Sequence, residues 1–109
     1  MTYLLHRGEF PPTASRYLMR IIRVQGVECL VTSLESRCDR GAMTTIMRIE
    51  PPPHGTVDTV TETMGAERAR FIRWRIYGEC IGDVSDLLRE GWKEVTQADV
   101  DEIRNGVMR

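Results

Sequence analysis

The hydrophobic pattern of residues 16–35 fits either a helix or a β-hairpin. As a helix, the segment would be capped by Thr13 and would carry an i, i+3, i+4 apolar stripe. That stripe consists of Ala14, Tyr17, Leu18, Ile21 and Ile22. As a hairpin, the segment would turn at Gln25-Gly26, which lies between two runs rich in β-forming residues.

Side-chain pairing favours the hairpin. In its register, two pairs of opposite charge and one apolar pair face each other, and each pair stabilises a sheet by up to about 1 kcal/mol. The opposed pairs are Arg16 with Glu35, Ile21 with Leu30, and Arg23 with Glu28. A helix would also crowd β-branched side chains. We therefore predict a hairpin, with a helix over residues 14–25 as the alternative.

Two further runs predict strands in the middle of the chain. Ala42 to Glu50 follows a turn at residues 39–41 and ends at a proline-rich loop. Thr56 to Thr63 is rich in Thr and Val and alternates weakly, and Met64 to Glu67 would form the turn that follows it.

Arg70 to Tyr77 shows the clearest alternation of apolar and polar residues and predicts another strand. One face would consist of Ile72, Trp74 and Ile76, which we expect in the core. The other face would consist of Phe71, Arg73, Arg75 and Tyr77. Joined by short connections, these runs predict an antiparallel β-meander of about four to five strands with one face buried.

The C-terminal third has helical signals. Asp83 would cap a short helix that ends before Gly91, and residues 92–95 would form a brief extended link. Thr96 and Asp99 form a variant of the capping box for a helix over residues 97–105. The sequence therefore predicts an α+β fold in which the meander is followed by two short C-terminal helices.

The chain of 109 residues has the length of one domain, so we expect a single domain over 1–109, mainly β over 1–78 and helical and acidic over 79–109. The composition, 41% hydrophobic and 28% charged, excludes a fully disordered chain, a collagenous chain and a disulfide scaffold. No stretch approaches the roughly 20 apolar residues of a membrane span, and Met1 to Leu5 is too short for a signal peptide. We therefore expect a cytoplasmic protein that does not associate with membranes.

The sequence offers no recognisable catalytic, cofactor or metal motif. Neither His6 nor His54 has an evident partner for general acid–base chemistry. The three cysteines have no spacing typical of zinc ligands, and their odd number favours reduced thiols. Gly78 to Gly82 lacks the Lys-Ser/Thr of a phosphate-binding loop. We therefore expect no enzymatic activity, no cofactor and no metal.

Arginine dominates the basic residues, and acidic residues gather near the C-terminus. Of 15 basic residues, 14 are arginine and one, Lys93, is lysine. Arginine binds phosphate and carboxylate groups in a bidentate way, although the codons of a GC-rich genome would produce the same excess. Residues 79–102 hold two basic and eight acidic residues, a balance of −6. From this region we select a candidate acidic partner surface, formed by Asp86, Glu90, Trp92 and Glu94.

The segment 68–77 is a second candidate site because it combines arginines with aromatic residues. Its selected residues are Arg68, Arg70, Phe71, Arg73, Arg75 and Tyr77. Single-stranded nucleic acid is bound by such a mixture, in which bases stack on aromatic rings and arginines contact phosphates. The plainer interpretation is a charged, solvent-exposed strand face.

These features predict a small non-enzymatic protein that binds a protein or nucleoprotein partner, as an inhibitor or accessory factor encoded by a phage or mobile element would. The alternative is a single-stranded nucleic-acid-binding module that uses segment 68–77. A net charge of −1 and an isoelectric point near 6.1 weigh against the alternative. Open sheet edges would also allow a homodimer.

Overall fold

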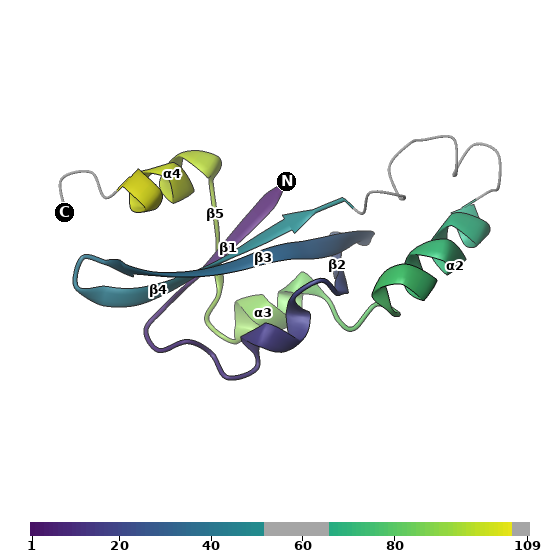
Figure 1. Cartoon of the computed structure of the whole chain (residues 1–109), viewed down its shortest axis with the longest axis horizontal. Helices are drawn as coiled ribbons and strands as arrows, with labels where there is room; N and C mark the ends of the chain where they lie inside the picture. The colour runs from purple at the N-terminus through teal and green to yellow at the C-terminus, as the bar shows by residue number, and fades with distance from the viewer. Residues whose placement is uncertain (52–65, 106–109) are drawn as a thin grey trace.

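The computed structural model describes residues 1–51 and 66–105, with the side chains of residues 66–69 excepted. It contains one antiparallel sheet of five strands in the order β2-β3-β4-β1-β5, and helices follow the sheet at the C-terminus (Figure 1). The predicted α+β fold is therefore confirmed. The strands are β1 (Thr2–Arg7), β2 (Ile21–Val24), β3 (Val27–Asp39), β4 (Ala42–Glu50) and β5 (Lys93–Val95).

Two tight hairpins join β2, β3 and β4 into a meander. Their central residues are Gln25-Gly26 and Arg40-Gly41, and all four have positive φ angles between 51° and 81°. This is the type I′ geometry that matches the twist of paired strands. The fourth strand of the sheet is β1, which pairs with β4 on one side and with β5 on the other.

The predicted β2–β3 register is confirmed near the turn, where Arg23 faces Glu28 and Ile21 faces Leu30. The predicted pairing of Arg16 with Glu35 is wrong. Arg16 lies instead in a short 3-10 helix, η1 (Ala14–Tyr17), and Glu35 pairs with Ile46 of β4. The helical alternative thus holds for one turn, because burial of Ala14 and Tyr17 favours a compact turn over a longer strand.

The two predicted C-terminal helices are present as α3 (Val84–Arg89) and α4 (Gln97–Asn105). Asp83 caps α3 in a reciprocal capping box with Asp86. At α4, the Thr96 N–H donates to Asp99 Oδ2 at 3.0 Å, and the Asp99 N–H donates to Thr96 Oγ1 at 3.1 Å. The extended link between these helices becomes β5, which completes the sheet beside β1.

Both faces of the sheet are covered around β1, rather than one face as predicted. Leu4 packs with Leu87 of α3 and Trp92 on one face. The neighbouring Tyr3 and Leu5 pack with Val100 and Ile103 of α4 on the other. Figure 1 shows η1 and α3 on one side of the sheet and α4 on the opposite side. Three consecutive apolar residues in a central strand require cover on both faces.

The predicted strand over 70–77 is wrong, because this segment is the C-terminal part of helix α2 (Ala66–Tyr77). The first two residues of α2, Ala66 and Glu67, also overlap the predicted turn over 64–67. The region 1–78, which was predicted to be mainly β, therefore ends in a helix. The predicted strand Thr56 to Thr63 lies outside the described residues. Strong helix formers, Ala, Glu and Arg, open the segment at residues 66–70.

Gly78 ends α2 with a left-handed cap that the alternating pattern did not predict. Its φ angle is +86°, and its N–H donates to the carbonyl oxygen of Trp74 at 2.8 Å. This bond satisfies a carbonyl group that would be unpaired at the helix end. Because the segment is a helix, Ile76 is 53% exposed and Trp74 is half-buried, so the prediction that both lie in the core is wrong.

The connection between α2 and α3 covers the β2 edge of the sheet. The Ile81 N–H donates to the Ile21 carbonyl, and the Arg23 N–H donates to the Gly82 carbonyl, both at 2.9 Å. The opposite edge is β5, a three-residue strand with exposed Lys93 and Glu94. Short, charged or covered edges disfavour pairing with another chain. Among the described residues, no helix has the length and apolar character needed to cross a membrane.

Candidate functional site

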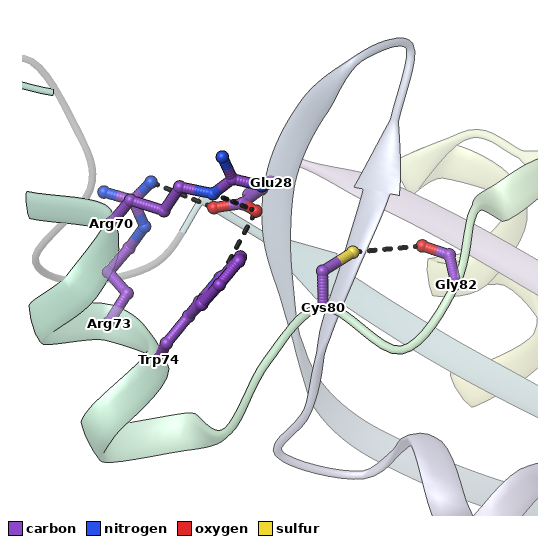
Figure 2. A network of polar contacts seen from close by, with 6 residues as sticks. All are labelled: Glu28, Arg70, Arg73, Trp74, Cys80 and Gly82. Carbon is purple, nitrogen blue, oxygen red and sulfur yellow. Dashed lines mark hydrogen bonds and ion pairs between the residues drawn. The ribbon is translucent and has the colours of Figure 1, made fainter. Parts of the chain in front are cut away.

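Helix α2 lies beside the β2–β3 hairpin and is held there by one carboxylate, that of Glu28 (Figure 2). Arg70 Nε donates to Glu28 Oε2 at 3.2 Å, and Arg73 Nη2 donates to Glu28 Oε1 at 3.1 Å. Trp74 Nε1 donates to Glu28 Oε2 at 3.3 Å. Positions i, i+3 and i+4 lie on one helix face, so these three donors converge on the same acceptor.

The contact between Glu28 and α2 is partly buried, and its positive charges outnumber its negative charge. The Glu28 and Arg73 side chains are 10% and 12% exposed, whereas the Arg70 side chain is 48% exposed. The Arg70 guanidinium also stacks over the Trp74 ring at 4.4 Å. Two guanidinium groups share one carboxylate, so the contact retains one net positive charge at its rim.

The opposite face of α2 is largely apolar, and it is exposed except at the half-buried Ile72. With 3.6 residues per turn, Phe71, Ile72, Arg75 and Ile76 lie on the side away from Glu28. Phe71 is 57% exposed and Ile76 is 53% exposed. The Arg75 guanidinium lies 5.9 Å from the Phe71 ring centroid, and no carboxylate among the described residues pairs with it. We name these four residues the outer face of α2.

The helix divides the residues that the sequence selected in segment 68–77. Arg70 and Arg73 lie on the Glu28 side, as does the half-buried Tyr77, while Phe71 and Arg75 lie on the outer face. The expected common face of Phe71, Arg73, Arg75 and Tyr77 is therefore wrong, because it required a strand. The side chain of Arg68 lies outside the described residues.

Four residues of this site were not selected by the sequence analysis. Three of them, Ile72, Trp74 and Ile76, were expected in the core, and Glu28 was expected to pair with Arg23 across the hairpin. A helical projection of residues 66–77 would have placed Ile76 beside Ile72, on the same half of the helix as Phe71, and the glycine at position 78 is the signal for that projection. No local signal identifies Glu28, because it is 42 to 46 residues from its partners in α2.

The four residues selected as an acidic partner surface do not form one surface. Asp86 belongs to the α3 capping box and pairs with Arg89. Glu90 and Glu94 are exposed, the first at the end of α3 and the second on β5. Trp92 is 3% exposed and belongs to the core, where its ring lies 5.4 Å from that of His6. A surface role for Trp92 is therefore wrong, because the turn after α3 directs its large ring inwards.

The described residues show no arrangement typical of a catalytic thiol or a metal centre. Burial raises the pKa of the Cys29 thiol, which makes this thiol a poorer nucleophile at neutral pH. The Cys80 thiol donates to the Gly82 carbonyl at 3.3 Å (Figure 2). Within residues 1–51 and 66–105, no group of three His, Cys, Asp or Glu side chains could hold a metal ion.

Comparisons with protein-family models, with curated proteins and with solved structures gave no match for this chain.

Proposed function

We propose that this protein is a small binding protein without catalytic activity, and that it engages a protein partner through the outer face of α2. The observation that carries the proposal is the exposure of Phe71 and Ile76 beside Arg75 on one helix face. Adjacent exposed apolar side chains often mark interaction sites. Aromatic residues and arginine are also enriched in the residues that dominate binding energy.

The anchoring of α2 favours recognition of a helix face. Glu28 fixes one side of the helix by accepting three hydrogen bonds. A partner could therefore bind the outer face while α2 stays attached to the sheet. A preformed helix can enter an apolar groove of a partner through apolar side chains that are three or four residues apart. Ile72 and Ile76 have this spacing, and Phe71 lies on the same outer face.

The positive charge of α2 indicates that the partner carries acidic groups. Residues 70–77 contain three arginines and no acidic residue, and Glu28 neutralises one of these charges. Arg75 and the exposed part of Arg70 would therefore meet carboxylates at the rim of the apolar groove. An inhibitor or accessory factor in the cytoplasm, of the kind that phages and mobile elements encode, is the class of protein that best fits such a surface.

Binding of single-stranded nucleic acid is the second proposal, and one observation favours it: Phe71 and Arg75 still lie together on an exposed face. It is weaker than the first because Arg70 and Arg73 are occupied by Glu28, and because Phe71 and Tyr77 lie on different sides of α2 rather than on one stacking surface.

A photo-crosslinking residue at position 76 separates the two proposals. In a lysate of the source organism, we expect an adduct with one protein that survives nuclease treatment and that Phe71→Ser abolishes. An adduct lost on nuclease treatment would instead support the nucleic-acid proposal.

The matched control carries the crosslinker at position 43, on the β3–β4 hairpin, where Met43 has a similar exposure of 47%. The same adducts from positions 43 and 76, or none from position 76, would contradict both proposals. The folded state of each variant is checked by its amide spectrum, so that an unfolded protein is not scored as a loss of binding.

A further inference from the structure

A cavity of about 300 Å³ lies between the sheet and α4, at the β5 edge. Its apolar lining consists of Leu5, Val95 and Ile103, which come from β1, β5 and α4. A second hollow of about 130 Å³ shares Leu5, Arg7 and Lys93 with it. Ligand pockets range from about 300 to 1,000 Å³, so the size of this cavity restricts it to a small molecule.

One wall of the cavity is basic. Lys93 and Arg40 line it, and neither forms an ion pair with a carboxylate among the described residues. Arg7 also lines this wall, where Arg7 Nη1 donates to Asp39 Oδ2 at 3.0 Å. Because Asp39 is 2% exposed, it fixes Arg7 in place and neutralises it. Lys93 and Arg40 thus supply the uncompensated positive charge.

The wall formed by α4 is acidic. Asp99 and Glu102 line the cavity from positions i and i+3 of the helix, which lie on the same side. Asp99 Oδ2 accepts the Thr96 N–H, which fixes the carboxylate while its other oxygen keeps its acceptor capacity. The lining of the cavity therefore contains two cations, two carboxylates of α4 and three apolar side chains.

We propose that this cavity binds a small zwitterion of the amino-acid class, with an apolar side chain. The carboxylate of the ligand would face Lys93 and Arg40, its ammonium group would face Asp99, and its side chain would pack on Leu5, Val95 and Ile103. A ligand with only a negative charge would pair with the basic side chains and leave the acidic side chains without a partner. A ligand with only a positive charge would do the reverse. Tight binding therefore requires both charges on one ligand.

This binding site is independent of the outer face of α2. Figure 1 shows α4 and α2 at opposite ends of the molecule. Loss of ligand binding would therefore leave the proposed partner surface intact, and loss of the partner would leave the cavity intact.

Three probes of matched shape test the proposal: L-leucine, 4-methylpentanoate, which lacks the ammonium group, and 3-methylbutylamine, which lacks the carboxylate. Titrations of the full chain are followed by amide chemical shifts in β1, β5 and α4. We expect L-leucine to shift these amides in a saturable way and each of the other probes to bind at least about tenfold more weakly. Hydrogen bonds to charged groups are worth about 1.5–3 kcal/mol, which corresponds to roughly tenfold or more.

Lys93→Met removes one charge of the basic wall and should weaken L-leucine binding by about tenfold. Glu94→Gln is the control, because successive residues of a strand face opposite sides and Glu94 pairs with Leu4 rather than Leu5. Equal affinity of Lys93→Met and the unchanged protein would overturn the proposal. The proposal is also overturned by the absence of shifts with L-leucine, or by equal binding of 4-methylpentanoate or 3-methylbutylamine.

Discussion

Glu28 shows how much of this fold depends on one side chain. Its carboxylate accepts hydrogen bonds from Arg70, Arg73 and Trp74, and these contacts hold the described side chains of α2 against the hairpin. Arg73 is 12% exposed, so without Glu28 it would be a largely buried charge with no acidic partner at that point. Leaving such a group unpaired costs more than the hydrogen bond itself contributes.

Glu28→Ala should therefore release α2 from the sheet while leaving the sheet folded. The expected loss is about 1–3 kcal/mol in the free energy of unfolding. Faster hydrogen exchange of the α2 amides, relative to those of β1 and β4, is the measurement that checks it. Glu90→Ala removes an exposed carboxylate elsewhere and should change neither quantity. Uniformly faster exchange across sheet and helix would show that Glu28 acts on the whole fold instead.

At the scale of elements, turn and capping residues correctly predicted one hairpin and the start of one helix. The β2–β3 hairpin followed from Gln25-Gly26 and its paired side chains, and the start of α4 followed from Thr96 and Asp99. The identity of α2 was missed because eight alternating residues outweighed the Gly78 stop signal. On a helix, the same eight residues divide between the Glu28 side and the outer face.

The site was less predictable than the elements. Segment 68–77 was selected for its arginines and aromatic residues, but its division into an anchored and an exposed face depends on Glu28, which is distant in sequence. The position of β1 between β4 and β5 likewise depends on contacts between the two ends of the chain. No periodicity within a short window contains such information.

Gly78→Ala tests the cap that ends α2. An alanine there must keep a φ angle of +86°, and its Cβ would lie 3.2 Å from Nη2 of Arg20. The left-handed conformation costs roughly 1–2 kcal/mol for a residue other than glycine, so we expect a loss of stability of at least that size in urea denaturation.

Gly82→Ala is the matched control for this cap. Gly82 has no positive φ angle, and a Cβ there would meet Asp86 at an ordinary distance of 3.5 Å. Equal stability of the two variants would mean that the chain after Trp74 can end the helix without a left-handed residue.

On the scale of the whole molecule, ion pairs connect α4 to the long β3–β4 hairpin. Arg104 Nε donates to Glu35 Oε1 at 3.0 Å, and Arg37 Nη1 donates to the Arg104 carbonyl at 3.0 Å. Arg37 also pairs with Glu35. Burial alone would raise the pKa of Glu35, but the hydrogen bonds and charges of Arg37 and Arg104 outweigh burial and lower this pKa below its ordinary value of 4.5.

These contacts predict how stability depends on pH. Because folding lowers the pKa of Glu35, its contribution to stability is fully present above about pH 4.5 and is lost as the pH falls through the folded-state pKa. Glu35→Gln should therefore be less stable at neutral pH and should lose less stability on acidification. Urea denaturation at a series of pH values measures both effects. Glu94→Gln, on β5, should follow the unchanged protein, and parallel pH curves for Glu35→Gln would contradict the prediction.

The order of the strands has a consequence for the synthesis of this protein. The ribosome releases β1 first, yet the neighbour on one side of β1 is β5, which begins at Lys93. Until β5 emerges, the backbone groups of β1 that face β5 have no strand to pair with, and the apolar side chains of Tyr3 and Leu5 lack the cover of α4. A nascent or prematurely terminated chain thus exposes an unpaired strand edge and apolar side chains. Such surfaces favour aggregation and are recognised by chaperones and proteases.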